Sequence, residues 1–389
     1  MSPHWRLGAA IVVTVLLAGG CQGRAAEEPA KPVHPQWQRL TLPAPPGEPG
    51  RLMLRDITAC AGRWYVVGAV ATAQGATRPA AWTSTDAQSW SSLAFVPESY
   101  YGRQNVLYSA ACRDGRLAVI GAKSGGAHGS PRVSTWQQRA DGSLVEVAAR
   151  FELYGGPAAV NVGRMAGGPA GWLIAGNRSS GAAAWVSPDS AAFEIVEAAP
   201  ELATDGRGVT WAFDAIATPG EWLMVGGVLP AGRIDRDPIA WTSPDGRVWR
   251  RLPAPATSEY EELQRVALIG GTAVAVGLRG RAFGAWRRGD GGWEAVGGFG
   301  AAGTSGVPAV TGLTVAGDQL LAATSDGTAH ALWSSPDGGR SWRSMVAPVA
   351  MPAGADRDVN LLALADRVLL LVDDGLGGAV WWTEIRTAS

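Results

Sequence analysis

The 389-residue sequence has no excess of either charge, because 33 Lys and Arg residues stand against 34 Asp and Glu residues. This balance excludes a protein that binds nucleic acid mainly through net positive charge. Lysine itself is almost missing, with Lys31 and Lys123 as its only copies, so nearly all positive charge is arginine. Hydrophobic residues make up 47% and charged residues 17%, and this composition excludes a wholly disordered chain.

Motifs for metal, phosphate and nucleotide chemistry are also missing. Beyond the first residues, the histidines are isolated from one another and from any Cys-x-x-Cys pair: His34, His128 and His330. No nucleophile elbow, P-loop or dinucleotide fingerprint occurs. Asp356, Asp358 and Asn360 have the spacing that opens a calcium loop, but Leu361 stands where that loop needs glycine, which favours a solvated turn. We expect no metal and no cofactor.

The longest apolar run near the start, residues 7–17, is too short to span a membrane as a helix. It follows Arg6 and ends in the small residues before Cys21, which is the pattern of a secretory signal. Residues 18–21 resemble the bacterial lipobox, although Leu17 stands one place earlier than usual. The resemblance implies a signal peptide over residues 1–20 and a lipid on Cys21.

Ordinary secretion, with cleavage near Ala25 or Ala26, is the alternative. Residues 21–35 hold few apolar side chains and three prolines, which predicts a flexible tether. The expected location is therefore extracytoplasmic, with the protein anchored to the cell membrane through its lipid.

Only two cysteines remain beyond Cys21. Cys60 and Cys112 occupy equivalent places in neighbouring copies of the repeat described next. In an oxidising compartment they could form a disulfide. Two buried free thiols are the alternative, because equivalent positions on neighbouring repeats can lie too far apart for a bond.

Tryptophan is abundant because it recurs in a repeat of about fifty residues. One tryptophan per repeat follows a small or apolar pair: Trp82, Trp136, Trp185, Trp241, Trp286, Trp333 and Trp382. Each repeat holds four apolar segments of strand length between turn signals, and no helical periodicity. This period predicts an all-β protein, a seven-bladed β-propeller over residues 36–389 with four antiparallel strands per blade. The tryptophans are expected to pack blade against blade.

The last repeat lacks its fourth strand because the chain ends seven residues after Trp382. The segment 36–43 resembles the fourth strand at 249–253. We therefore expect the N-terminal strand to close the last blade, so that no free edge is left between the two ends of the ring.

The turn between the third and fourth strands carries Ser-x-Asp, and Ser-Pro-Asp-Gly in two copies, which favours a type I turn. The stretch 335–342 matches the pattern S-x-D-x-G-x-S-W and resembles the Asp box, or BNR repeat, of sialidase-like propellers. The resemblance implies a structural role for one aspartate per turn: Asp86, Asp189, Asp245 and Asp337.

Function is expected on the face where the second-to-third and fourth-to-first strand connections emerge, which we call the loop face. The second-to-third strand connections are long at residues 69–81, 122–135 and 227–240. Four of the six tyrosines fall on the fourth-to-first connections, and tyrosine suits recognition surfaces; covering the loop bases is the alternative. The candidate binding residues are Tyr100, Tyr101, Arg103, Tyr154, Tyr260, Glu261, Arg233 and Arg236.

The sialidase resemblance also implies three arginines that hold a carboxylate, and a tyrosine nucleophile paired with glutamate. Matching residue types are Arg55, Asp56, Arg265, and Tyr260 with Glu259 or Glu261. Sialidases tend to six blades, however, and catalytic motifs are sparse. We therefore predict a monomeric, non-catalytic binding or scaffolding propeller whose partner is an extracytoplasmic protein or glycan. The alternatives are a sialidase-type glycoside hydrolase and a glycan-binding module without hydrolysis.

Overall fold

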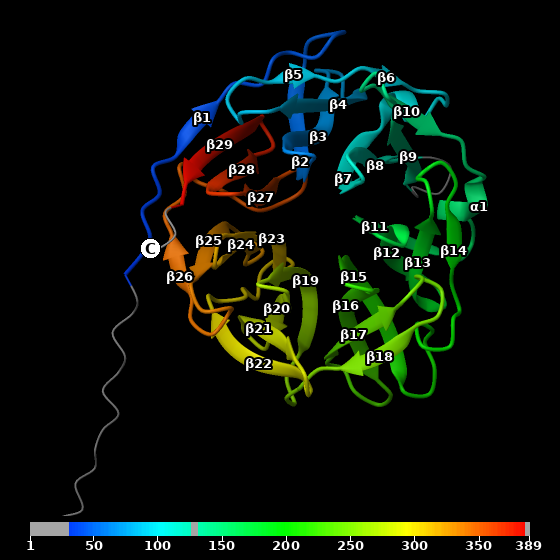
Figure 1. The fold of residues 1–389 in the computed structure, drawn as a ribbon, viewed down its shortest axis with the longest axis vertical. Helices are drawn as coiled ribbons and strands as arrows, with labels where there is room; N and C mark the ends of the chain where they lie inside the picture. Colours follow the sequence, from blue (N-terminus) through cyan, green and yellow to red (C-terminus); the bar gives the residue numbers. More distant parts are fainter. Residues whose placement is uncertain (1–30, 126–130, 386–389) are drawn as a thin grey trace, which may run out of the picture. The chain divides into compact units, whose positions relative to one another are not determined.

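The computed structural model describes residues 31–125 and 131–385, which form seven β-sheets arranged as blades around a common centre (Figure 1). The predicted seven-bladed propeller with four antiparallel strands per blade is confirmed. Within the described residues the helices are one turn of α-helix, α1 (Phe151–Tyr154), and one 3₁₀ turn, η1 (Gly102–Gln104). No helix among these residues has the length and apolar character of a membrane span. The expected signal peptide, Cys21 and His128 lie outside the described residues.

The innermost strand of each blade contacts the innermost strands of both neighbouring blades, so the ring is closed (Figure 1). Six of these seven strands contain a register shift, and the last one runs without a shift. Such bulges bend a strand and re-aim its side chains. The inner strands are β2 (Arg51–Cys60), β7 (Val106–Arg113), β11 (Ala159–Gly168), β15 (Gly208–Thr218), β19 (Glu261–Ile269), β23 (Ala309–Ala316) and β27 (Asp358–Leu364).

The second strands are the most buried parts of the blades, because apolar residues cover both of their faces. They are β3 (Arg63–Ala71), β8 (Arg116–Lys123), β12 (Gly171–Arg178), β16 (Glu221–Pro230), β20 (Thr272–Arg279), β24 (Gln319–Ser325) and β28 (Arg367–Asp373).

The third strands carry the repeated tryptophan. They are β4 (Thr77–Ser84), β9 (Arg132–Gln138), β13 (Gly181–Ser187), β17 (Asp237–Ser243), β21 (Ala282–Gly289), β25 (His330–Ser335) and β29 (Gly378–Glu384).

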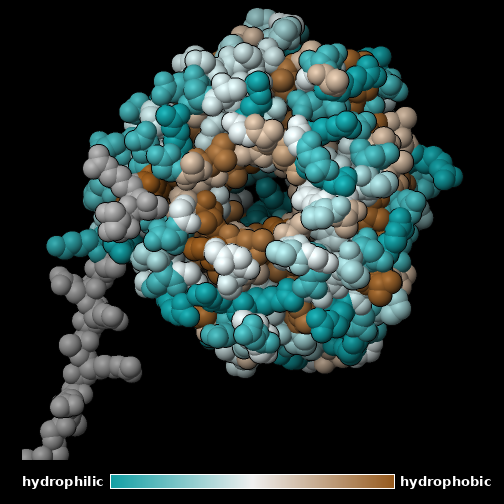
Figure 2. All heavy atoms as spheres, viewed as in Figure 1, coloured by the Kyte–Doolittle hydropathy of each residue, from teal (hydrophilic) through white to brown (hydrophobic). Residues whose placement is uncertain are grey.

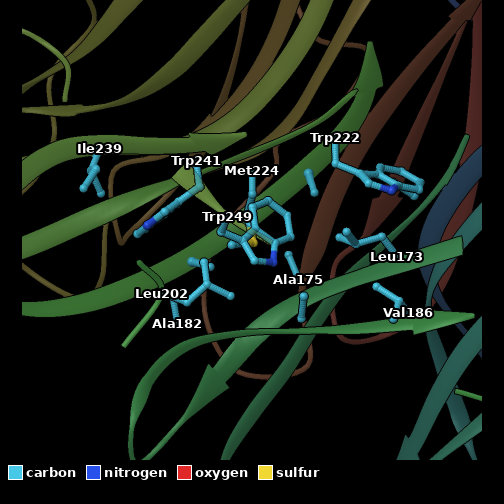
Figure 3. Packing of buried hydrophobic residues seen from close by; sticks show 14 residues of the cluster. Leu173, Ala175, Ala182, Val186, Leu202, Trp222, Met224, Ile239, Trp241 and Trp249 are labelled. Carbon is cyan, nitrogen blue, oxygen red and sulfur yellow. The ribbon is translucent and has the colours of Figure 1, made fainter. Parts of the chain in front are cut away.

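Six of the seven predicted tryptophans pack against the preceding blade, as expected. In the last blade Trp381 takes the equivalent register, opposite Leu370, and packs on blade 6, whereas the predicted Trp382 packs toward blade 1. Trp241 of β17 is fully buried and lies in one cluster with Leu173 and Ala182 of the preceding blade (Figure 3). Most of these indoles also hold the connection that arrives from the preceding blade. Trp82 Nε1, for example, donates to the carbonyl of Pro43 at 2.8 Å, and Trp241 Nε1 donates to that of Glu201 at 2.9 Å. The tryptophan thus fills the wedge between blades and fixes the incoming chain.

The outer strands are short, and the first one in the chain belongs to the last blade. β1 pairs with β29, with Gln38 opposite Trp382 and Leu40 opposite Val380, so the predicted closure is confirmed. β6 (Phe95–Val96) leaves blade 1 and pairs parallel with β10 of blade 2. The outer strands are β5 (Ser91–Ser92), β10 (Leu144–Val147), β14 (Glu194–Val196), β18 (Arg250–Pro253), β22 (Gly292–Phe299), β26 (Arg343–Met345) and β1 (Gln38–Leu40).

The chain attaches to the ring earlier than we expected. Val33, which we placed in the tether, pairs with β26 of blade 6 through Val33 N to Ser344 O at 2.8 Å and Val346 N to Val33 O at 2.9 Å. Trp37 Nε1 donates to Val346 O at 2.8 Å as well. The N-terminal segment therefore fastens blade 6 before it completes blade 7.

A disulfide joins Cys60, at the end of β2, to Cys112, near the end of β7, with the Cα atoms 5.2 Å apart. The bond links the inner strands of blades 1 and 2, so equivalent positions of these two repeats do come close enough. Closing a loop of 52 residues stabilises the folded state by about 4 kcal/mol in the chain-entropy model.

Candidate functional site

The loop face is formed by shorter connections than we expected. Backbone pairing in the three hairpins continues further than we expected, up to Ala71 and Thr77, Lys123 and Arg132, and Val228 and Asp237. Figure 2 shows the ring from the side of Figure 1, with a hollow at its centre and apolar residues on part of the rim.

Exposed apolar side chains gather on the loop face. Ile234, Val307 and Leu376 are 91%, 82% and 86% exposed at the tips of three of its connections. Tyr100 and Phe151 are 69% and 49% exposed on two further connections. These side chains belong to connections of different blades, and singly exposed apolar residues are common on protein surfaces, so their exposure alone does not mark a binding site.

The structure divides the candidate binding residues into exposed and buried ones. Tyr100 and Arg103 lie exposed on the connection before β7, and Tyr101 beside them is half-buried. Tyr154 is only 6% exposed, because α1 turns it under the loop, where its hydroxyl contacts Thr135 Oγ1 at 3.5 Å. Glu261 is 1% exposed and accepts from Arg279 Nε at 3.1 Å. Tyr154 and Glu261 therefore support the face rather than form it.

The other three candidates lie near one another on blades 4 and 5. Arg233 Nη1 pairs with Asp237 at 2.7 Å, while Arg236 and Tyr260 line a pocket of about 590 Å³. We call it the β15–β19 pocket, because Trp211 and Phe213 of β15 form one wall and Gln264 and Arg265 of β19 form its base. Residues 302–310, which lead into blade 6, form the other wall with Arg281.

A buried glutamate organises the polar side of this pocket. Glu262 is 3% exposed and accepts from Tyr260 Oη at 2.7 Å, Arg236 Nη1 at 2.8 Å and Gln264 Nε2 at 2.7 Å. Burial and the nearby charge of Glu262 raise the pKa of Tyr260, so its hydroxyl stays protonated. The Arg236 guanidinium also lies 5.3 Å from the Trp211 ring, so this side chain joins the acidic and aromatic sides of the pocket.

Positive charge exceeds negative charge in the β15–β19 pocket. Arg236, Arg265 and Arg281 line it, but Glu262 is its only acidic residue among those that the structure describes. Arg265 donates from Nη1 to its neighbour's carbonyl at 2.7 Å, while its buried Nε has no described partner. Burial, together with the charge of Arg164, lowers the pKa of Arg265 to about 10. The carboxylates of Asp214, Asp56 and Asp358 act on Arg265 in the opposite direction, and Glu262 pairs with Arg236. Arg281 forms no salt bridge with a described residue, so it is the arginine of this pocket that an anion would meet.

The channel beneath the pocket holds more arginines, but carboxylates already pair with them. Arg55 Nη1 contacts Asp373 at 2.6 Å, and Arg164 Nη2 contacts Asp56 at 2.8 Å. Asp214, Asp56 and Asp358 also act on Arg265. The arginines that the sialidase resemblance pointed to, Arg55 and Arg265, therefore face carboxylates of this chain rather than an empty site.

Sequence reasoning missed the partner of Tyr260. We expected Glu259 or Glu261, but the strand places Tyr260 and Glu262 on the same side because side chains alternate along a strand. The aromatic wall does not follow from this alternation, because Phe213 is the unpaired residue at the register shift of β15. Period-two spacing could have found the Tyr260–Glu262 pair.

The opposite face carries the aspartate turns between third and fourth strands. Asp86 accepts from the backbone amides of Gln88 at 2.8 Å and Ser89 at 2.7 Å, and these bonds lower its pKa. Asp189, Asp245 and Asp337 accept backbone amides in the same way. All four carboxylates are thus used within their own turns. Among the described residues, no three His, Cys, Asp or Glu side chains are grouped as metal ligands.

No protein-family model matches the chain, and no curated protein matches it either. Solved structures do. The β-propeller domain of the trilobed protease from Pyrococcus furiosus has 9% identity and a TM-score of 0.49, over 87% of this chain and 96% of that one. Hadza microbial sialidase Hz136 has 13% identity and a TM-score of 0.47, over 86% and 66%. Trypanosoma rangeli sialidase in complex with the inhibitor DANA has 10% identity and a TM-score of 0.44, over 92% and 58%.

Proposed function

We propose that this protein is an extracytoplasmic, lipid-anchored propeller that binds an anionic ligand at its loop face without catalysing a reaction. The anchor is argued from the apolar run 7–17 and Cys21. The disulfide between Cys60 and Cys112 supports an oxidising compartment. The observation that carries the binding role is the β15–β19 pocket, where three arginines meet one acidic residue beside an aromatic wall.

The residues that line the pocket indicate which chemical groups its ligand carries. Arginine guanidinium groups bind carboxylate or phosphate oxygens with paired hydrogen bonds. Trp211 and Phe213, whose ring centres are 6.5 Å apart and whose planes are inclined by 50°, offer two apolar ring surfaces to a sugar or other ring. An acidic glycan satisfies both requirements, and so does an acidic group on a protein partner.

A glycoside hydrolase of sialidase type is the second candidate, because the Tyr260 hydroxyl lies 2.7 Å from a Glu262 oxygen. Two features favour binding instead. Arg236 and Gln264 already engage the Glu262 carboxylate, which weakens it as a base. The raised pKa of Tyr260 disfavours the phenolate that a nucleophile needs.

A glycan array probed with the full-chain protein tests the proposal. We expect sialylated or glucuronate-terminated probes to bind and neutral lactose not to bind. Arg281→Ala and Trp211→Ala should each weaken binding about tenfold, which corresponds to about 1.4 kcal/mol. Arg288→Ala is the matched control, because Arg288 pairs with Glu221 at 2.8 Å away from the pocket. Equal binding of neutral and acidic probes would contradict the proposal.

Hydrolysis is measured in the same preparation with a fluorogenic sialoside. We expect no turnover above buffer. If the unchanged protein hydrolyses the sialoside and Tyr260→Phe does not, the protein is a hydrolase and the binding proposal is wrong.

A further inference from the structure

The loop face has a second pocket, on blade 2 between the connections before β7 and after β10, that shares no lining residue with the β15–β19 pocket. Its volume is about 350 Å³. We call it the Arg132 pocket, because Arg132, at the start of β9, lies within it. Val133, Val147 and Ala148 supply an apolar wall, and Tyr154 lies behind them. The space is large enough for one or two side chains of a partner.

Two aromatic rings hold the Arg132 guanidinium. Its central carbon lies 4.1 Å from the centre of the Phe151 ring and 5.5 Å from that of Tyr101. Stacking on the rings uses the faces of the guanidinium and leaves its N–H edge for a ligand. Arg132 donates no hydrogen bond to the residues that the structure describes, and its Nε is buried without a partner. The two rings therefore hold the Arg132 guanidinium in a position to donate to an acceptor that the described residues do not supply.

Glu146 is the buried acid of this pocket, and hydrogen bonds within the chain already use its carboxylate. Glu146 accepts from the amides of Glu98 and Ser99 at 2.8 Å each, and from the hydroxyls of Ser99 at 2.6 Å and Ser134 at 2.8 Å. Burial raises the pKa of Glu146, but these hydrogen bonds outweigh burial and lower it overall. Its charge therefore holds the connection before β7 in place. No carboxylate of a described residue forms a salt bridge with Arg132.

The rim indicates what kind of molecule docks. Tyr100, 69% exposed, lies edge-on to Tyr101 with ring centres 5.3 Å apart, and Phe151 is 49% exposed on the other side. Tyrosine and arginine around a small apolar pocket are typical of the central residues of protein–protein interfaces. Arg150 and Glu98 are both exposed on the rim and offset each other in charge, so the preference for an acidic partner rests on the Arg132 guanidinium.

We propose that the Arg132 pocket docks an acidic segment of a protein partner, with an Asp or Glu carboxylate paired to the Arg132 guanidinium and an adjoining apolar side chain against Val133 and Ala148. This site goes beyond the proposed function, and the two sites can fail separately because they share no residue. The partner surface is defined by its chemistry: a carboxylate next to an apolar side chain, in an extended segment that the tyrosines flank.

A peptide array tests this docking site. The full-chain protein is probed with capped hexapeptides that carry Glu or Asp beside Leu or Phe, each matched to a Gln or Asn version. The dissociation constants of the best pairs are then measured by fluorescence polarisation. We expect the acidic peptides to bind at least tenfold more tightly than their amide versions.

The decisive variant is Arg132→Lys, which keeps the charge and loses the planar fork. It should weaken the acidic peptides about tenfold and reduce the difference between each acid and its amide, because the retained charge still attracts a carboxylate while the paired hydrogen bonds are lost. Phe151→Ala, at an exposed position, should weaken the same peptides by releasing the guanidinium. Arg39→Lys is the matched control, because Arg39 stacks at 5.9 Å on Trp381 in the closing blade. Its melting curve and affinity should equal those of the unchanged protein.

The proposal is overturned if acidic and amide peptides bind alike, or if Arg132→Lys leaves the acid preference intact. Binding of anionic vesicles or acidic glycans at Arg132, with no peptide bound, would also overturn it, because the occupant would then be of another class. If the β15–β19 pocket binds no acidic glycan but the acidic peptides still bind at Arg132, the docking site is supported and only the proposed function fails.

Discussion

Asp56→Asn is the substitution that should damage the ring most. Asp56 lies just after the bulge in β2 and is fully buried. Its carboxylate accepts from Ala110 N of blade 2 at 2.8 Å, Arg164 Nη2 of blade 3 at 2.8 Å and Asn360 Nδ2 of blade 7 at 2.6 Å. One side chain therefore joins four blades at the wall of the channel.

The size of the effect follows from these contacts. All three partners are donors, so the new amide NH₂ must face a donor in either orientation, and the charge that compensates Arg164 is lost. Removing one partner of a buried ion pair costs about 3–5 kcal/mol. The Arg164 side chain is 27% exposed, so water takes over part of its solvation, and we expect a loss near the lower end, about 3 kcal/mol.

Guanidinium denaturation followed by tryptophan fluorescence measures this change. Asp290→Asn is the matched control, because Asp290 is exposed and its side chain makes no hydrogen bond among the described residues; it should stay within about 0.5 kcal/mol of the unchanged protein. Adding Arg164→Met to Asp56→Asn should recover part of the loss, since the unpaired charge is gone. A free energy of unfolding for Asp56→Asn equal to that of the control would refute the reasoning.

Three further predictions concern pH, closure and anchoring. Burial raises the pKa of Asp358 from 3.8 to about 6, so the stability that its protonated form contributes is present below pH 4 and is lost as pH rises through 6. In denaturation curves, the free energy of unfolding of Asp358→Asn should be higher than that of the unchanged protein by roughly 1–3 kcal/mol at pH 7.5 and equal to it at pH 4. An equal difference at both pH values would contradict this assignment. Deleting residues 36–43 removes β1 and should lower the melting temperature of the whole ring; an unchanged melting curve would mean that closure contributes nothing. Cys21→Ser should move the protein from the membrane fraction to the medium, and continued retention in the membrane would contradict lipidation.

The bulges explain why the side chains that line the channel could not be predicted from the sequence repeat. Alternation places every second side chain of a strand on one face, but a bulge shifts that order within six of the seven inner strands. Phe213 thus lines the β15–β19 pocket, while its neighbour Asp214 accepts from Val266 N of the next blade at 3.2 Å. Arg164 meets Asp56 across 108 residues of chain. Nothing local in the sequence pairs them.

The amino-acid sequence by itself determined the architecture. Tryptophans at a stride of about fifty residues specify seven similar sheets, and the likeness of segment 36–43 to a fourth strand specifies how they close, because both signals are local and every copy repeats them. Tertiary structure alone decided the sites. It buried Tyr154 and Glu261, paired Tyr260 with Glu262, and placed Arg132 between two rings from different connections. Such contacts join residues whose separation depends on how neighbouring blades are wedged together, and that geometry exists only once the ring has formed.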